Sequence, residues 1–560
     1  MKYLLPSLFC LICCIVNSQN YTIQNIEYQL NSQDNTASVV SCSLPGIRDW
    51  NIDSMSLDIV VIPEKIKVGD DFFTITSLGD YAFADCPGLV SIVLPSTLKR
   101  IGDYVFQGCV NLYDIAIPKN VETIGLGCFM ACENLRKILL PTSLKTLSAN
   151  IFAYCYSLNN VTIPSAVAVI DDYAFLACHS LSNVRFPKRL NTIGYAAFSE
   201  CAFSVVKIPA NVTTIDNKAF SSCNHLDSII LPTSLSLLGD SVFFECNNLR
   251  RICIHGSQNF GSDFDGRIFY QKTSDTSRTL LFYNRLAQVC VVPDNFTIAA
   301  GVFRNNTNLK RVILPSTLKS IGDFAFQGCS SLSDIVIPED IEYIGKAAFM
   351  GCTSLKSFNR FHNDYFFSAD DGKALFHKTE GGVAMIAYTD TVPVVAVPSF
   401  VTEFGYGLFH SHNEISEILI PSSVNTLGAL SFYGCTNLKS ISLPEGLDVI
   451  PEQLFAGCTS LRQVIIPQGV TTVGDKVFAD CSNLSLLVLP ESLKMLGQLL
   501  FTGVSPHNLK IFSLSQTPAV LRINTFKGIS AAELHIPVGM TEKYKNNTIW
   551  GKFHNIIDDI

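Results

Sequence analysis

Cysteine has the greatest capacity for chemistry in this sequence, because a thiol can form a disulfide, bind a metal or act as a nucleophile. The chain has 20 Cys among its 560 residues. Residues of one column in stacked strands lie about 4.8 Å apart and point the same way, whereas the side chains of a disulfide must converge. We therefore expect a ladder of small buried thiols at the 13 cysteines that stand three positions after a Phe: Cys86, Cys109, Cys132, Cys155, Cys178, Cys201, Cys223, Cys246, Cys329, Cys352, Cys435, Cys458 and Cys481.

The cysteine column does not have the pattern expected of residues that pair in disulfides. Asn306, His412 and Val504 occupy the same column in three repeats, so any pairing scheme would be broken there. Outside the column and the N-terminal apolar segment, the remaining cysteines could include one bridge in an exported chain: Cys42, Cys128, Cys253 and Cys290.

Two short motifs could hold a cation. His410 and His412 have a spacing that suits a metal, but His412 falls in the cysteine column and no carboxylates cluster beside it. The segment from Asp263 to Gly266 is similar to the start of a calcium loop but lacks the remaining ligands, so we expect a hairpin turn. The sequence has no nucleophile elbow, glycine-rich phosphate loop or His-Glu zinc motif. It predicts no enzyme, no metal and no cofactor.

A repeat organises the elements around these residues. The segment LVSIVLPSTLKRIGDYVFQGC (89–109) returns at 309–329 as LKRVILPSTLKSIGDFAFQGC, identical at 14 of 21 positions. A fixed period of 20–50 residues is typical of a solenoid. Within three blocks the step is 23 residues, with one step of 22, and 16 copies are anchored by Phe83, Phe106, Phe129, Phe152, Phe175, Phe198, Phe220, Phe243, Phe303, Phe326, Phe349, Phe409, Phe432, Phe455, Phe478 and Phe501.

Each part of the repeat has a physical role. The segment L-x-x-I-x-L predicts a short strand, and the Pro that follows ends it because proline cannot donate to a ladder. A second extended piece, a tight bend and one helical turn carrying the Phe complete the unit. Burying a Phe contributes about 2–3 kcal/mol, so the Phe in every repeat is expected to be the main stacking contribution.

Two interruptions separate the blocks, because Phe243 to Phe303 and Phe349 to Phe409 each span 60 residues. An Asp-Gly pair between strand-like runs predicts a β-hairpin in both, and we expect these hairpins to project from the array. The predicted organisation is a signal peptide (1–18), an N-terminal β cap (19–78), repeat blocks (79–253, 293–357 and 398–514), hairpin insertions (254–292 and 358–397) and a C-terminal cap (515–560).

The N-terminus predicts export. Lys2 precedes an apolar run from Leu4 to Val16, and a cleavage site before Gln19 follows. A short membrane anchor is disfavoured because the run is under the ~18 residues needed to span a bilayer. Lipidation of a cysteine in this segment is the other alternative. No later run is long enough to cross a membrane, so we expect a mature chain without a transmembrane segment, secreted or at the cell surface.

Composition narrows the class of partner. Hydrophobic residues make up 48% of the chain and charged residues 16%, which excludes disorder. The net charge of −8 is spread along the chain without a basic run, so nucleic acid and anionic membranes are poor candidates.

One row of the strands is a candidate contact surface. The residue two positions before the strand-ending Pro should face outward, and more than half of these residues are apolar. β-propensity alone could explain this; a strip that binds a protein is the alternative. The candidate ligand-binding residues are Leu139, Arg185, Lys207, Ile230, Ile313, Val336, Leu419 and Ile465.

The segments IGDYVFQGCVNLYDIAIP (101–118) and IGDFAFQGCSSLSDIVIP (321–338) closely resemble the BspA-like branch of leucine-rich-repeat proteins. The resemblance covers residues 21–560 and implies an α/β, strand-rich, right-handed parallel solenoid with β caps and no catalytic residues. It also implies adhesion to matrix proteins or other cells. The chain departs from many relatives in lacking an evident C-terminal sorting domain, which leaves its anchoring open.

The sequence therefore predicts an exported, non-enzymatic repeat protein that binds a protein ligand or another cell surface, and no small-molecule substrate. An envelope scaffold is the first alternative. A carbohydrate-binding accessory protein is the second, disfavoured because clustered acids, His and exposed Trp are lacking.

Overall fold

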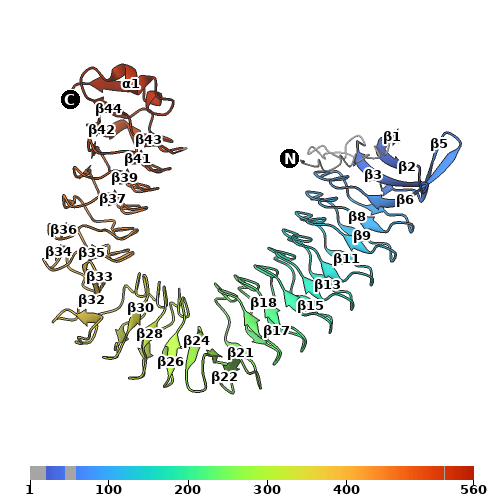
Figure 1. Ribbon diagram of the computed structural model, residues 1–560, viewed down its shortest axis with the longest axis horizontal. Coiled ribbons are helices and arrows are strands. Elements are labelled where there is room, and N and C mark those ends of the chain that lie inside the picture. The colour runs from blue at the N-terminus through green and yellow to red at the C-terminus, as the bar shows by residue number, and fades with distance from the viewer. Residues whose placement is uncertain (1–19, 44–58, 523) are drawn as a thin grey trace, which may run out of the picture. The chain divides into compact units, whose positions relative to one another are not determined.

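The computed structural model describes residues 20–43, 59–522 and 524–560. Two compact units divide the chain, unit 1 ending at Gly266 and unit 2 beginning at Arg267 (Figure 1). The fold is strand-rich with almost no helix, a parallel β-solenoid of about 21 turns. The predicted signal peptide and residues 44–58 of the predicted N-terminal cap lie outside the described residues.

The L-x-x-I-x-L segments form short parallel strands, called here the first ladder, which in unit 1 are divided into sheets of two, four and three strands. Its strands bury the central Ile or Val and expose both neighbours, because successive side chains of a strand point to opposite faces. In unit 1 it consists of β4 (Val60–Val61), β7 (Ile92–Val93), β9 (Asp114–Ala116), β11 (Lys137–Leu139), β13 (Asn160–Thr162), β15 (Asn183–Arg185), β17 (Val205–Lys207), β19 (Ser228–Ile230) and β21 (Arg251–Cys253).

The extended piece before the bend forms the second ladder. In unit 1 its strands are β6 (Asp71–Leu78), β8 (Arg100–Ile101), β10 (Thr123–Ile124), β12 (Thr146–Leu147), β14 (Val169–Ile170), β16 (Thr192–Ile193), β18 (Thr214–Ile215) and β20 (Leu237–Leu238). The predicted β cap is confirmed by β1 (Asn20–Ile23), β2 (Ile26–Asn31), β3 (Thr36–Cys42) and β5 (Lys65–Val68). The solenoid begins earlier than predicted, because β4 and β6 already belong to the two ladders.

The Phe segment is not a helical turn, and that prediction is wrong. The residues two positions before and after each Phe have left-handed backbone, as at Tyr104 (φ 55°) and Gly108 (φ 68°) around Phe106. This placement of left-handed residues turns every second N–H group of the segment toward the next repeat. The N–H groups of Tyr104, Phe106 and Gly108 thus donate to carbonyls 22 residues further on, at N···O distances of 2.7, 2.8 and 2.8 Å. Phe106 stacks on Phe83 and Phe129, with ring centroids 5.6 and 5.4 Å apart.

Unit 2 repeats this architecture. Its first ladder consists of β25 (Val289–Val291), β27 (Arg311–Ile313), β29 (Asp334–Ile335), β34 (Val394–Ala396), β36 (Glu417–Leu419), β38 (Gln463–Ile465), β40 (Leu486–Leu489), β42 (Lys510–Ser513), β44 (Glu533–Ile536) and β45 (Asn555–Asp558). Its second ladder includes β26 (Phe296–Ile298), β28 (Ser320–Ile321), β30 (Tyr343–Ile344), β35 (Glu403–Phe404), β37 (Val449–Ile450), β39 (Thr472–Val473), β41 (Met495–Leu496) and β43 (Val520–Leu521).

Both predicted hairpins are present, but they do not simply project. β23 (Ile268–Lys272) pairs antiparallel with β24 (Arg278–Tyr283), and β32 (Ala374–Thr379) pairs antiparallel with β33 (Gly382–Tyr388). The second strand of each hairpin then pairs in parallel with the second ladder, β24 with β26 and β33 with β35. The prediction of projecting hairpins is therefore wrong for these strands. Two further short strands are β22 (Phe260–Ser262) and β31 (Phe366–Ser368).

The C-terminal segment closes the core of unit 2. A helix, α1 (Thr541–Lys545), and two 3₁₀ turns, η1 (Pro506–Asn508) and η2 (Trp550–Lys552), are found there. Trp550 is fully buried against Phe526, with ring centroids 4.7 Å apart, and its Nε1–H donates to the Ala519 carbonyl at 3.0 Å. The predicted last strand and short helix are confirmed, and they prevent the last stacked Phe from facing water.

Candidate binding surface

The cysteine column is a ladder of buried thiols, as predicted. Every column thiol after Cys86 lies against the carbonyl of a Phe in the preceding repeat; the Cys109 Sγ–H donates to the Phe83 oxygen at 3.1 Å and Cys435 to Phe409 at 3.1 Å. The thiol of Cys86, in the first repeat, donates to the Ala84 carbonyl at 3.5 Å. Burial raises the pKa of Cys435 to about 12. No pair of cysteines among the described residues forms a disulfide, and this holds for the four cysteines outside the column. Thiols so placed are poor nucleophiles and serve packing.

The two cation motifs have structural explanations. His412 lies in the core against Tyr388 and Phe409, and its burial lowers the pKa of the ring. The segment from Asp263 forms a turn in which the Gly266 N–H donates to the Asp263 carbonyl at 3.1 Å, as the hairpin-turn prediction requires. Within the described ranges, no group of three or more His, Cys, Asp or Glu side chains could hold a metal.

The residue two positions before the strand-ending Pro does face outward. We call this line of residues on the first ladder the surface row. Leu139 is 64% exposed and Ile465 59% exposed, which is unusual for side chains of their size. The other predicted residues of the row are also exposed: Arg185, Lys207, Ile230, Ile313, Val336 and Leu419.

Strand register places the members of the surface row beside one another. Ala116 is opposite Leu139, Thr162 opposite Arg185, and Lys207 opposite Ile230. Unit 2 has the same alignment at Val291 with Ile313, Ala396 with Leu419, and Ile465 with Val488. Neighbouring strands are about 4.8 Å apart, so surface-row side chains of paired strands lie side by side. The pairing is interrupted between some turns, as between β15 and β17 in unit 1 and between β29 and β34 in unit 2.

Sequence reasoning missed several residues of this surface. Val61, Val291 and Ala396 extend the row, and Val61 is 59% exposed. The signal was present, because each stands two positions before a Pro (Pro63, Pro293 and Pro398); these segments were instead assigned to the cap and to the edges of the insertions. Outside the surface row, sequence reasoning also missed Phe264, which is 94% exposed in the turn before Gly266.

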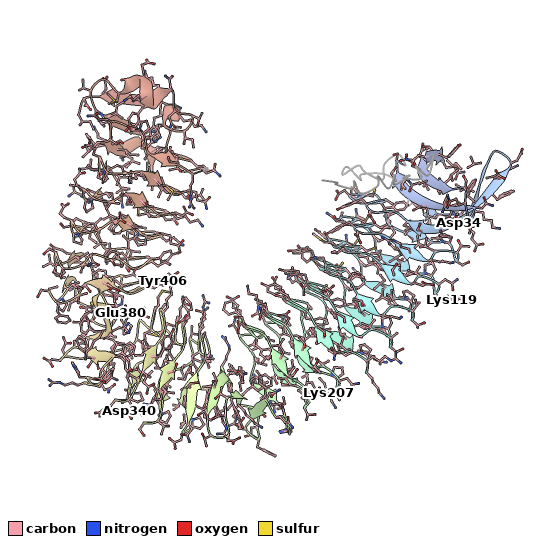
Figure 2. The ribbon with its side chains drawn as sticks, viewed as in Figure 1. Asp34, Lys119, Lys207, Asp340, Glu380 and Tyr406 are labelled. Carbon is pink, nitrogen blue, oxygen red and sulfur yellow. The ribbon has the colours of Figure 1, made fainter. Side chains whose placement is uncertain are left out.

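Charged residues of the first ladder differ between the two units. In unit 2, Arg311 and Asp334 form an ion pair at 2.8 Å, and Lys510 and Glu533 form another at 2.9 Å. Each pair joins adjacent strands at matching register. In unit 1 the exposed Arg185 and Lys207 have no carboxylate within ion-pair distance among the described residues. Lys119 and Lys207 lie along the same edge of unit 1 (Figure 2).

Enclosed space for a small ligand is scarce. A cavity beside His412, lined also by Phe349, Met350 and Tyr388, has a volume of about 10 Å³. That volume is enough for about one water molecule. The open hollows elsewhere are shallow features between successive turns, such as the one lined by Leu144 and Thr146. The extended first-ladder surface is therefore the feature with the size and exposure for recognition.

Two parallel ladders, a stacked Phe column and a buried cysteine column define a leucine-rich-repeat solenoid. The family described as "BspA type Leucine rich repeat region" matches residues 64–175, 145–274, 278–368 and 402–533. This chain belongs to that family. The family resemblance expected from the sequence is thus confirmed.

Several solved structures are similar to this chain. A leucine-rich cell surface protein from Faecalibacterium prausnitzii is 24% identical, with 79% of this chain and 93% of that chain covered and a TM-score of 0.47. A leucine-rich repeat protein from Bacteroides ovatus is 22% identical (88% and 94% covered, TM-score 0.31). The pneumococcal vaccine antigen PcpA is 18% identical (97% and 99% covered, TM-score 0.36). Among curated proteins, none matches this chain.

The described residues include no helix with the length and apolar character needed to cross a membrane. Solenoids of the leucine-rich-repeat type are typically non-catalytic and act as scaffolds for protein–protein interaction.

Proposed function

We propose that this protein is an exported, non-enzymatic adhesion protein that binds a protein ligand or another cell surface through its surface row. One observation carries the proposal: large apolar side chains recur, exposed, at the same position of the repeat, and on consecutive turns at Val291, Ile313 and Val336. Contiguous apolar exposure is uncommon on soluble proteins and marks interaction sites. An isolated exposed Leu would need no explanation, but a repeated one does.

The arrangement suits a large partner. Each turn adds one surface-row residue about 4.8 Å from the last, so the surface extends along each unit. Repeat proteins use such extended surfaces to recognise macromolecules. The apolar N-terminal segment from Leu4 to Val16 supports export, and the BspA-type family supports an extracellular or cell-surface location.

Exposure on the native cell tests the proposal. Antibody labelling of intact cells is combined with protease shaving, and an internal protein of the same cell serves as the control for lysis. We expect the protein to be labelled and shaved on intact cells. Protection until the envelope is opened would contradict the adhesion function and would favour the envelope scaffold.

Participation of the surface row is tested separately. Leu139→Glu should weaken adhesion of the purified protein to cells or matrix protein, because a charge would replace the most exposed apolar contact. Leu237→Glu is the matched control, since Leu237 is an exposed leucine of unit 1 on the second ladder. Equal adhesion of the two variants would contradict a role for the surface row.

A further inference from the structure

Four basic side chains are concentrated on the first-ladder side of unit 1. Arg185 ends β15 and Lys207 ends β17, while Lys188 and Arg189 follow at the corner after Pro187; all four are exposed. We call them the basic cluster. The only acid between residues 173 and 215 is Glu200, whose Oε2 lies 3.2 Å from His179 Nε2. Such a local excess of bases stands out in a chain with 48 acids and 40 bases.

The basic cluster has no counter-charge within unit 1. Among the described residues, no carboxylate lies within ion-pair distance of any of its four side chains. The same ladder does pair other cations: Arg250 lies 3.2 Å and Arg251 3.5 Å from Asp227. Arg185 and Lys207 lie on different sheets, because β15 ends one sheet and β17 begins the next. Like charges close together repel each other, and no ion pair of these side chains offsets that repulsion. The lack of a stabilising ion pair favours a role of the basic cluster in recognition.

Apolar side chains flank the basic cluster on the same face. Val205 is exposed on β17 together with Lys207, and Ile230 is the register partner of Lys207 on β19. Leu139 is exposed two strands before Arg185. A ligand that covers the cluster would therefore also cover apolar surface, about 5–10 Å to either side at the spacing of strands.

We propose that the basic cluster binds an acidic protein segment that carries apolar side chains among its carboxylates. This inference rests on the proposed function and specifies the chemistry of its partner. The guanidinium groups of Arg185 and Arg189 have the fork geometry that binds a carboxylate through two parallel hydrogen bonds. A polysaccharide polyanion would meet the charges but would supply no aliphatic side chains for Val205 and Ile230, so the apolar flanks favour a protein segment.

Binding of the full mature chain to synthetic probes tests this. The probes are a fluorescein-labelled peptide of Glu and Leu residues, the same peptide with Gln in place of Glu, and labelled heparin. We expect the Glu peptide to bind in preference to the Gln peptide, with an affinity that falls as salt rises. The double variant R185S/K207S should slow association about tenfold or more. Lys145→Ser changes an exposed cation that directly precedes the second-ladder strand β12, two repeats before Arg185, and should leave binding unchanged.

Three results would overturn the inference. These are equal binding of the Glu and Gln peptides, unchanged binding by R185S/K207S, and binding of heparin in place of the Glu peptide. Thermal unfolding of R185S/K207S is measured in parallel and is expected to match that of the unaltered chain, because both side chains are exposed and make no ion pair. If the basic cluster does not bind the acidic peptide, surface exposure on native cells and the effect of Leu139→Glu on adhesion are unaffected. The experiments therefore distinguish failure of this inference from failure of the proposed function.

Discussion

Units 1 and 2 share one backbone architecture and differ in how their first ladders treat charge. In unit 2, cations and acids of adjacent strands meet: Arg311 with Asp334 and Lys510 with Glu533. In unit 1, Arg185 and Lys207 lie two positions further along their strands, in the surface row, and have no carboxylate beside them, although Arg251 of the same ladder pairs with Asp227. Strand spacing is the same in both, so geometry does not explain the difference. Charged side chains that form ion pairs with each other are already neutralised, whereas unpaired charged side chains are available to bind a ligand.

The cores of the two units differ in how much of the thiol ladder each contains. Unit 1 carries eight column cysteines in consecutive repeats, and unit 2 carries five, interrupted by an insertion. The Phe stacks are alike, with centroids 5.4 Å apart for Phe106 and Phe129 and 5.0 Å for Phe303 and Phe326. Perturbing core and surface separately can therefore show which differences between the units matter.

Alkaline pH should have the largest effect and should act on both units. Burial raises the pKa of Cys435 and Cys481 in unit 2 to about 12, whereas an unfolded thiol has a pKa of about 8.5. In unit 1, burial likewise raises the pKa of Cys132 and Cys178. The unfolded state thus loses protons first, so stability is complete below about pH 8.5 and falls by about 1.4 kcal/mol per such thiol for each pH unit toward 12. Urea unfolding followed across this range should show a falling free energy of unfolding in both units.

Thiol accessibility provides the control for that experiment. In native protein at pH 8, the column cysteines should react negligibly with a thiol reagent, whereas the partly exposed Cys253 should react. The same protein in denaturant should react fully. Rapid modification of the native column cysteines would contradict the buried ladder. Alkaline destabilisation of one unit alone would contradict the thiols as its cause.

Removing one ring from each Phe stack should have the next largest effect, and it should be the same in both units. Phe129→Ala and Phe326→Ala each leave a cavity between two stacked rings and should lower the free energy of unfolding by about 3–5 kcal/mol. Urea denaturation of each variant measures the loss. A markedly smaller loss for one variant would show that the two cores are not equivalent.

Charging the surface row should change binding and leave folding nearly intact. Leu139→Glu in unit 1 and Ile465→Glu in unit 2 should alter the free energy of unfolding by no more than about 0.5 kcal/mol, because both side chains are exposed. Loss of adhesion in one variant alone would assign the contact to that unit. Unfolding caused by Leu139→Glu would mean that the residue belongs to a core.

The smallest effect on stability is expected from removing the ion pair between Arg311 and Asp334 in unit 2. Asp334→Ala should cost about 0–1 kcal/mol, as for other exposed pairs. It also leaves Arg311 unpaired on the same strand as the exposed apolar Ile313, so that unit 2 too has an unpaired cation beside apolar surface. A gain in affinity for the Glu-Leu peptide, measured by fluorescence anisotropy, would show that pairing is what distinguishes the units. Asp340→Ala, which removes an acid from the pairing site of Lys319 on another face, is the control.

The repeat, and with it most of the core, could be predicted from the sequence because the signal is periodic. The buried Phe and Cys columns, the strand-ending Pro and the outward position of Leu139 depend only on spacing along the chain and on alternation within a strand. The same reasoning would have found Val61 from Pro63 had the first strand of the solenoid not been assigned to the cap.

The tertiary structure decided what depends on contacts between turns. Left-handed backbone at Tyr104 has no local cause, since non-glycine residues seldom adopt it; hydrogen bonds to the next repeat impose it. The Asp-Gly turns predict hairpins, but pairing of β24 with β26 and of β33 with β35 requires partners distant in sequence. Charge pairing likewise depends on contacts between turns, because Arg311 and Asp334 are 23 residues apart and meet only when successive turns bring them into register. Composition alone therefore predicts an acidic protein without a basic surface, whereas the folded chain brings Arg185, Lys188, Arg189 and Lys207 together on one face of unit 1.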